Sequence, residues 1–455
     1  MAVSTEKITL IRNLAAFWIF GLCNNYAYVI MLSAAEDIMD KQQHKTKNDT
    51  ENYCLKAITE PHCSSVSTGA VLLADILPTL LIKMTFPFFI QRIPFGLRHG
   101  TVCMLQVICY FVVAYSISVP MSLIGVVFAA MGSGLGEMTY LALSSHFPRS
   151  MISAWSSGTG GAGIVGSLAY AGLTEPHFAN LSPKNACLVM LIVPAVFAVA
   201  YWFLMVIPDT VHQVQILKPE TWIITNSNST TSSTCSTEKI SSYTGSEVDL
   251  SANATRPGKL GSTSSNEHKF VEQKKLTFKE QLLLVVPMLK YMIPLACVYI
   301  GEYLINQGLT ELIYFDCSHG FHLSRKSQYR WYQVLYQLGV FISRSSVNIW
   351  KLPFWVMMLL PVLQMVNAIF FTFESIYFFI PHIWIIFILI VYEGLLGGSS
   401  YVNTFDRIHR EVPPDVKEYC LSAASMGDAA GIVVAGFAAI PLHNFVCDQQ
   451  KYHIH

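Results

Sequence analysis

Acidic side chains occur within long apolar stretches of this sequence, where a carboxylate is unusual. They are Asp75, Glu137, Glu302, Glu393 and Asp428. A carboxylate at the centre of a lipid bilayer costs about 2.5–3.5 kcal/mol on insertion scales, so acids retained there line cavities, form pairs or carry protons. Each acid alone is explained equally well by function or by a structural contact between helices. The whole set, spread over both halves of the chain, indicates a polar cavity.

A stripe of polar side chains occurs near residue 300. Its members recur at spacings of three and four residues, which places them on one face of a helix. They are Tyr299, Glu302, Tyr303, Asn306, Gln307 and Thr310. Because the rest of this stretch is apolar, the stripe must face protein or water rather than lipid. All of its members except Tyr303 and Thr310 are candidate substrate-binding residues.

The apolar stretch that follows carries a second polar face, formed by Arg330, Gln333 and Gln337. Arg330 either counters the charge of an anionic substrate or lies at the lumenal membrane interface, and the residues favour neither reading. Asn24 and Asn25, in the first apolar stretch, can donate hydrogen bonds to a substrate or to neighbouring helices. We take all five as candidates for substrate binding.

Motifs for nucleotide, metal and hydrolytic chemistry lack the context that they need. The segment Gly158–Gly163 reads GxGxxG, but no strand or βαβ unit surrounds it, and small residues at this spacing let membrane helices pack closely. The fourteen histidines form no HExxH motif, so we expect no metal and no other cofactor. The absence of a GxSxG motif leaves hydrolysis unsupported, and we do not expect an enzyme.

The composition indicates a membrane protein. The 455 residues are 53% hydrophobic and only 13% charged, whereas soluble domains carry about 25% charged residues. Too few charges remain to cover the surface of a soluble protein of this size. The 29 basic and 29 acidic residues balance, so the chain lacks the basic excess of a nucleic-acid-binding protein. The expected partner is therefore the lipid bilayer.

Eleven apolar stretches are long enough to cross a bilayer as helices. They span residues 14–35, 67–90, 100–119, 122–145, 152–173, 186–207, 281–314, 329–346, 352–373, 377–405 and 418–442. Residues 208–279 between the sixth and seventh stretches are rich in Ser, Thr, Asn and Lys, which is typical of a disordered linker. The sequence thus predicts an all-α membrane protein with a six-helix bundle over residues 1–207 and a five-helix bundle over 280–455.

The charges of the short loops favour a cytosolic N-terminus, and an odd number of spans then places the C-terminus in the lumen. Arg344 is counted among the cytosolic loop charges in this topology. The sequons at Asn48 and Asn180 fall in lumenal loops and are candidate glycosylation sites. Cys54 and Cys63 share the first lumenal loop and are a candidate disulfide pair.

Two consecutive spans of each half align with one another. Ser153–Gly163 matches Ser422–Ile432 at an offset of 269 residues, and Gly132–Tyr140 matches Glu393–Tyr401 at an offset of 261. Small-residue helices can resemble one another by composition alone, but two matches in the same order favour a real repeat. Parallel repeats joined by a linker indicate a major-facilitator-like architecture, in which substrate binds near the bilayer midplane between the halves. Tyr140, which ends its matching segment, is therefore another candidate.

Short segments in nearly every span resemble the battenin family of lysosomal membrane proteins. They include Gly21–Tyr26, Ala70–Thr79, Ser156–Gly163, Tyr329–Gln333, Tyr392–Gly398 and Tyr401–Phe405. The last segment adds Asn403 to the candidate substrate-binding residues. The resemblance implies a late endosomal and lysosomal location, a transporter-like fold and a role in clearing glycerophosphodiesters. It also implies roles in lysosomal pH and autophagy.

Two functions follow as hypotheses. In the first, the bundle transports small anionic metabolites, and its buried acids couple transport to protons. In the second, the bundle is a membrane anchor whose cytosolic linker recruits trafficking partners. Deleting residues 221–274 distinguishes them, because a transporter keeps its flux and a scaffold loses its role. The buried acids favour transport, since an anchor has no reason to bear their cost.

Overall fold

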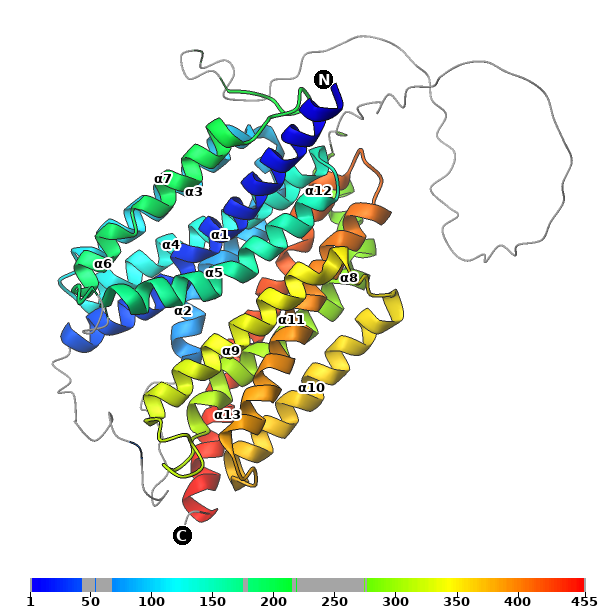
Figure 1. Cartoon of the computed structure of the whole chain (residues 1–455). Coiled ribbons are helices and arrows are strands. Elements are labelled where there is room, and N and C mark those ends of the chain that lie inside the picture. Colours follow the sequence, from blue (N-terminus) through cyan, green and yellow to red (C-terminus); the bar gives the residue numbers. More distant parts are fainter. Residues whose placement is uncertain are drawn as a thin grey trace, which may run out of the picture.

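The computed structural model describes residues 2–42, 54, 68–174, 179–214, 218, 274 and 276–453. Over these residues the chain is helical and contains no strand. The structure is therefore an all-α protein, as the sequence predicts. Figure 1 shows the N- and C-termini at opposite ends of the bundle, which agrees with an odd number of crossings.

The N-terminal half contains six membrane-length segments, and the sixth is broken into short helices. Their helices are α1 (Ala2–Gln42), α2 (Thr68–Thr85), α3 (Phe95–Ala114), α4 (Val119–Leu143), α5 (Ser150–Thr174), α6 (Pro183–Val189) and α7 (Ile192–Val199), with α7 continued by a π-helix, η5 (Ala200–Leu204). Short 3-10 turns follow α2 and α4, at Phe86–Phe88, Ile90–Arg92 and Ser144–His146. Each of the six predicted stretches coincides with one of these segments.

The C-terminal half contains five such segments. They are α8 (Phe278–Leu304), α9 (Arg325–Ser345), α10 (Phe354–Tyr377), α11 (Ile383–Glu411) and the broken pair α12 (Lys417–Ala424) and α13 (Met426–His453). The end of α8 continues into a π-helix, η7 (Ile305–Leu309), and a 3-10 turn, η8 (Thr310–Leu312); the turn η9 (Ser346–Asn348) follows α9. In Figure 1 the blue-to-green helices gather at the upper left and the yellow-to-red helices at the lower right.

Length and hydropathy single out seven of the described helical segments as able to cross a membrane unaided. Helix α9 is not among them. Its low mean hydropathy has a clear cause, because its sequence includes Arg330, Gln333, Gln337 and Arg344. In the structure α9 packs on α5 and α11.

Helix packing follows the same pattern in both halves. Within the N-terminal half, α1 packs on α4 and α5, and α4 packs on α2 and α3. Within the C-terminal half, α8 packs on α11 and α13, and α11 packs on α9 and α10. The pattern maps α1–α5 onto α8, α9, α10, α11 and the α12–α13 pair in order. This is the arrangement expected of parallel repeats.

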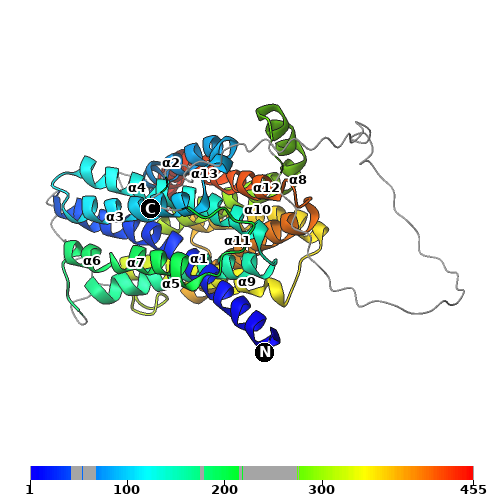
Figure 2. The ribbon, with the colours of Figure 1, turned by 90° about the horizontal axis from the view of Figure 1, so that it is seen from above.

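The contact between the halves obeys the same symmetry. The pair α2 and α13 and the pair α5 and α9 make the main contacts across it, and each pair is the repeat equivalent of the other. Figure 2 shows the molecule from above, with α3, α6 and α7 on one side and α8, α10 and α11 on the other. The largest hydrophobic core spans this boundary, from Phe17 and Trp155 to Leu295 and Leu421. The polar groups described below therefore lie within an apolar surround.

The residues predicted as a linker are only partly described. Residues 208–214 follow η5, where Val211 is buried and Val214 lies near Gly96 of α3. Thr277 accepts a hydrogen bond from the backbone N–H of Glu280 and forms a capping box that begins α8. Most of residues 219–275 lie outside the described part of the chain.

Candidate functional site

A buried lysine lies at the centre of the contact between the halves. Lys83, in the last turn of α2, is 2% exposed, and its Nζ lies 2.7 Å from Oε2 of Glu137 on α4. The same Nζ donates to both carboxylate oxygens of Asp428 on α13, each at 3.0 Å. One cation thus joins an acid of its own half to an acid of the other half. Desolvated charges require such pairing.

Aromatic side chains extend this cluster toward α5. Tyr401 of α11 donates its hydroxyl hydrogen to Oε1 of Glu137 over 2.6 Å. Trp155 of α5 donates in turn from Nε1 to the Tyr401 hydroxyl oxygen over 3.2 Å. Both rings are fully or almost fully buried. Glu137 therefore has partners on both carboxylate oxygens, one a cation and one a phenol.

A second cation, Arg344, lies near the end of α9. Its guanidinium donates to the Thr159 hydroxyl of α5 over 2.7 Å and to the Tyr299 hydroxyl of α8 over 2.9 Å. It also lies over the Tyr401 ring, 4.2 Å from the centroid, which is a cation–π contact. The Nε of Arg344 is buried and has no hydrogen-bond partner in the described part of the chain.

Two further acids lie deeper in the C-terminal half. Glu302 of α8 accepts a short hydrogen bond from the Tyr336 hydroxyl of α9, and Glu393 of α11 accepts one from Nδ2 of Asn306 over 2.7 Å. Each is at most 1% exposed. The Oε2 atoms of both acids lack a partner among the described residues. These carboxyl groups have unused acceptor capacity inside the bundle.

Glycines make room for this network. A Cβ on Gly397 would meet the carboxyl group of Glu302, and a Cβ on Gly158 would meet the backbone carbonyl of Trp18. Gly160 and Gly163 of α5 likewise lie against Phe341 and Gln337 of α9. The prediction that the GxGxxG segment serves close helix packing is confirmed, because this segment carries the α5 contacts with α1 and α9.

Six predicted site residues join the network directly. They are Glu137, Tyr299, Glu302, Asn306, Glu393 and Asp428. Gln337 lies beside it at the α5–α9 contact. Gln333 and Gln307 are partly buried, and Nε2 of Gln333 has no hydrogen-bond partner among the described residues.

Other predicted residues have structural partners away from the network. Asn24 donates to the Asn25 side chain and to the backbone carbonyl of Ser133, so it joins α1 to α4. Tyr140 pairs with His99 within the N-terminal half, at 2.5 Å. Asn403 accepts from the backbone N–H of Leu352, which fixes the segment before α10.

The structure does not place Arg330 in the network. Arg330 is exposed near the start of α9, more than three turns from Arg344. Its exposed position fits the alternative of a residue at the membrane interface. Arg344, predicted as a loop charge, occupies the interior position instead.

The predicted pairing of Cys54 with Cys63 is wrong. Cys54 forms a disulfide with Cys317, which lies 263 residues later in the segment between η8 and α9. Two cysteines in one loop are close in sequence, but the fold brings Cys54 beside the other half, with a Cα–Cα distance of 5.1 Å. The disulfide covalently joins the two halves. Cys63 lies outside the described residues.

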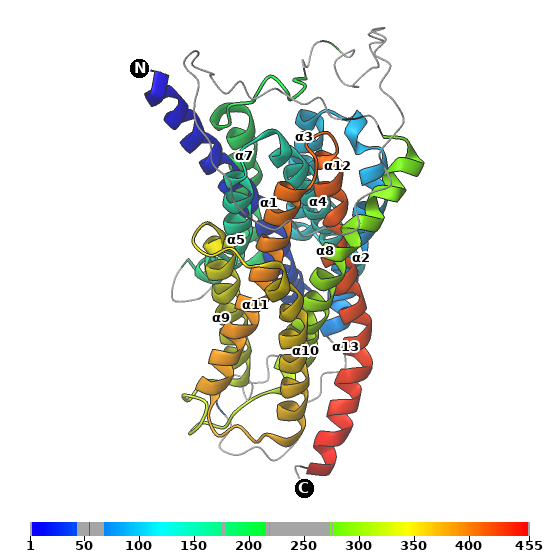
Figure 3. The ribbon, with the colours of Figure 1, turned by 90° about the vertical axis from the view of Figure 1, so that its right-hand side faces the viewer.

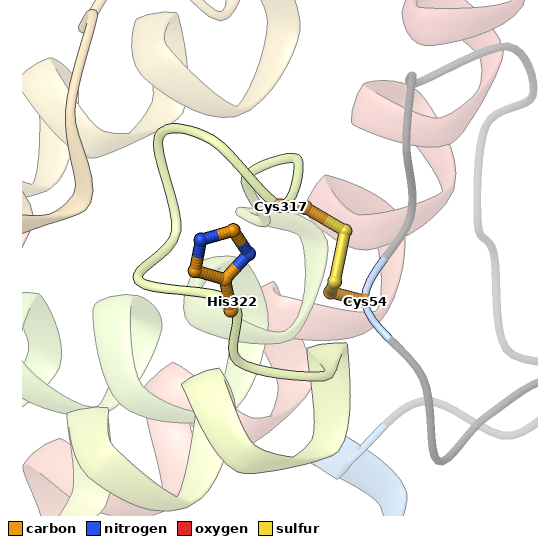
Figure 4. A group of neighbouring side chains, drawn as sticks. All are labelled: Cys54, Cys317 and His322. Carbon is orange, nitrogen blue, oxygen red and sulfur yellow. A yellow bond between two sulfur atoms is a disulfide. The ribbon is translucent and has the colours of Figure 1, made fainter.

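His322 lies beside this disulfide (Figure 4), and the three side chains are close enough to resemble a metal site. The cysteine sulfurs are bonded to each other, so they are not thiolate ligands.

Asp316 accepts hydrogen bonds within the same loop. Partial burial raises its pKa, but hydrogen bonds from Ser318 and His319 outweigh burial and hold the pKa below its usual value.

Only one of the two predicted glycosylation sites lies in the described part of the chain. Asn48 lies outside the described residues. Asn180 is exposed before α6 and has a left-handed backbone with φ of 49°, which asparagine tolerates well. Its side chain is accessible to modification.

Ion pairs also join the halves. They involve α3 and α12, which Figure 3 shows near the end of the bundle that carries the N-terminus. Arg98 of α3 pairs with Glu418 of α12 at 3.3 Å, and His146 lies 3.6 Å from the same carboxyl group. Arg149 pairs with Asp406 of α11 at 2.9 Å. These pairs hold one end of the contact closed, while the disulfide joins the halves at the other end.

The sequence prediction missed the cations and the aromatic hydrogen-bonding residues of the network, namely Lys83, Arg344, Trp155, Tyr336 and Tyr401. Lys83 carried a usable signal, because it lies within the predicted span 67–90. Arg344 lies near the end of its span and therefore resembles a loop charge. Buried aromatic residues give no such signal, since they are common in any membrane helix.

Comparison with known proteins shows which family the chain belongs to. The family model described as CLN3 protein matches residues 15–449. The chain belongs to the CLN3 family. It is 39% identical to battenin of Canis lupus familiaris over 98% of this chain and 93% of the relative. Protein btn-1 of Neurospora crassa is 33% identical and protein BTN1 of Candida glabrata 36%, each over 96% of this chain.

The match to the CLN3 family model covers both halves and every helix that contributes to the network. It agrees with the resemblance to battenins and with a multi-pass protein of the lysosomal membrane type. The lipid bilayer is accordingly a partner of this chain. The geometry of the network, rather than the family, indicates which residues act.

Proposed function

We propose that this CLN3-family protein exports small anionic metabolites of the glycerophosphodiester class from lysosomes. The observation that carries the proposal is the continuous network of buried charged and polar groups between the two halves. It runs from Lys83 and Asp428 through Arg344 to Glu302 and Glu393. A structural anchor has no use for charges at this depth.

The position of the network fits a transport site. It lies between parallel repeats and draws side chains from α2, α4, α5, α8, α9, α11 and α13. Transporters with this plan bind substrate between the halves and expose it by moving one half against the other. In the present structure the network is closed, because Lys83, Glu302 and Glu393 are each at most 2% exposed.

The acids give the proposed transporter a means of coupling to protons. Neither Glu302 nor Glu393 forms an ion pair with a cation among the described residues. Each has one carboxylate oxygen without a hydrogen-bond partner there. A buried carboxyl group without a counter-ion gains most from taking up a proton. In our proposal the N-terminus is cytosolic and the C-terminus lumenal, so an acidic lumen supplies the protons. Export then supports lysosomal homeostasis, pH and autophagy.

The test measures glycerophosphodiesters in lysosomes of cells that lack the protein and express either the wild type or Glu302→Gln. The amide preserves the acceptor for Tyr336 but cannot carry a proton. We expect glycerophosphodiester release to fall about tenfold, which corresponds to losing roughly 1.4 kcal/mol in the limiting step. Asp448→Asn, an exposed acid at the end of α13, is the matched control and should release at the wild-type rate.

Equal release by the wild type, Glu302→Gln and cells without the protein would contradict transport. That result would favour the alternative of a membrane-anchored scaffold. Normal release by Glu302→Gln alone, at every lumenal pH, would remove Glu302 from the mechanism.

A further inference from the structure

Two cations inside the bundle, the buried Lys83 and the partly buried Arg344, occupy equivalent positions of the repeat. Lys83 on α2 and Arg344 on α9 are separated by 261 residues, the same offset that relates Gly132–Tyr140 to Glu393–Tyr401. Each lies near the end of its helix and contacts the other half of the protein. Their partners are equivalent as well. Asp428, which binds Lys83, aligns with Thr159, which binds Arg344, at the offset of 269 residues.

The equivalent sites differ in charge. Lys83 has two carboxylates, Glu137 and Asp428, within 3.0 Å. At the corresponding positions Arg344 has the hydroxyl of Thr159 and, in place of Glu137, Gly398. A Cβ on Gly398 would lie 3.2 Å from Cγ of Arg344, so this residue is adjacent to Arg344 but carries no acid.

Arg344 therefore lacks a counter-ion. Its hydrogen-bond acceptors are two neutral hydroxyls, and it forms no ion pair within the described part of the chain. Glu302 acts on it electrostatically, but that carboxyl group accepts from Tyr336 and lies against Gly397. The buried Nε of Arg344 has no partner at all among the described residues. A cation that is largely removed from water and has a buried donor without a partner is costly unless an anion completes the site.

We propose that Arg344 is the anion-binding residue of the transport site and that it takes the phosphate of a phosphodiester monoanion. This inference rests on the proposed function. The planar guanidinium can bind two phosphate oxygens at once, which suits a phosphodiester with two free oxygens. The bound phosphate lies beside Arg344 as the Asp428 carboxylate lies beside Lys83. Tyr299 then donates its hydroxyl hydrogen to the ligand, while the Thr159 hydroxyl keeps donating to the backbone carbonyl of Ser156 and accepting from Arg344.

The charge balance selects a monoanion. One unpaired guanidinium offers one positive charge, and the carboxyl groups of Glu137 and Glu302 lie in the same network. A phosphomonoester with two negative charges would add an uncompensated charge beside these acids, which is unfavourable in a desolvated site. At neutral pH, where glycerol phosphate carries nearly two negative charges, the site should therefore bind glycerophosphodiesters in preference to glycerol phosphate.

The test converts the Arg344 site into a copy of the Lys83 site. Thr159→Asp supplies the missing carboxylate at the equivalent position, and Thr159→Asn is the uncharged control of the same shape. The full-length protein is purified in detergent, and the rise in its melting temperature is measured with glycerophosphoglycerol, with glycerol as neutral control. We expect the Kd of Thr159→Asp to be at least tenfold higher than that of Thr159→Asn, because the two variants differ in charge and not in shape.

Two results separate the inference from the proposed function. If the wild type binds and transports glycerophosphoglycerol but Thr159→Asp and Arg344→Gln bind it as tightly, the inference about Arg344 is wrong and transport stands. If the folded wild type neither binds nor transports this probe, the proposed function fails as well. Arg344→Gln provides the answer should both substitutions at Thr159 prevent folding, because it removes the cation without adding bulk.

Discussion

Lys83 shows how the structure holds a charge inside an apolar bundle. Its ammonium group contacts two carboxylates from two different helices, one in each half of the protein. Removing one member of a buried cluster leaves the others without a counter-charge, which costs more than the cluster itself contributes. The lysine is therefore required for the stability of the contact, whatever its part in transport.

We predict that Lys83→Met destabilises the protein by about 3–5 kcal/mol at neutral pH. The melting temperature of the purified protein measures the effect. Lys451→Met is the control, because Lys451 and its partner Asp448 are both exposed and such a pair contributes little. A melting temperature equal to that of Lys451→Met at neutral pH would contradict the account.

Single residues of the site could be predicted to different degrees. The acids Glu137, Glu302 and Asp428 were found because a carboxylate in an apolar stretch is a local signal. Their partners depend on the fold, since Lys83 and Asp428 are 345 residues apart. Arg344 was misplaced because a cation near a helix end resembles a loop charge until packing shows which way it points.

Helices α1 and α5 pack closely because each has a glycine at a point of contact where a side chain would not fit. Gly158 of α5 lies against the backbone of α1 at Trp18, and Gly21 of α1 lies against the backbone of α5 at Trp155. This reciprocal contact positions Trp155 and Thr159 for the network. Backbone atoms cannot yield to a methyl group as a flexible side chain can.

We predict that Gly158→Ala destabilises the protein by about 1–3 kcal/mol, the usual range for overpacking. Gly100→Ala on α3 is the matched control, because a Cβ there meets nothing within 4 Å. It should be neutral or slightly stabilising, since alanine favours helices more than glycine does. Thermal unfolding of the two variants side by side measures the difference. Equal melting temperatures would show that α1 and α5 pack less closely than described.

The helices themselves were predictable, but their breaks were not. Apolar length alone located every span, because lipid requires about 20 apolar residues per helix. The π-helix at Ile305–Leu309 and the break between α12 and α13 near Ser425 have no comparable signal in the sequence. Both breaks lie close to network residues, Asn306 and Asp428, where local geometry depends on neighbouring helices.

At the scale of the whole molecule, two features tie the halves together from opposite ends. Arg98–Glu418 and Arg149–Asp406 join them at the end that carries the N-terminus, and the Cys54–Cys317 disulfide joins them at the other. The parallel repeat was visible in sequence only for its last two spans. Helix packing extends it to α1 and α8, whose sequences have diverged too far to align.

We predict that the disulfide mapped on the purified protein joins Cys54 to Cys317. Proteolysis without reductant, followed by mass spectrometry, should yield one cross-linked pair of peptides that contains these residues. Reduction should separate them. A peptide in which Cys54 is bonded to Cys63 would instead support pairing within one loop and would remove the covalent link between the halves at this position.

The central claim is that the contact between the halves is a path for anionic metabolites. Purified wild-type protein in liposomes, with the outside or the inside made acidic, tests it most directly by uptake of radiolabelled glycerophosphoglycerol. The account predicts saturable uptake that exceeds protein-free liposomes, depends on the pH gradient and falls at least tenfold in Arg344→Gln. Uptake equal to that of protein-free liposomes by folded wild-type protein, whichever way the gradient runs, would contradict it.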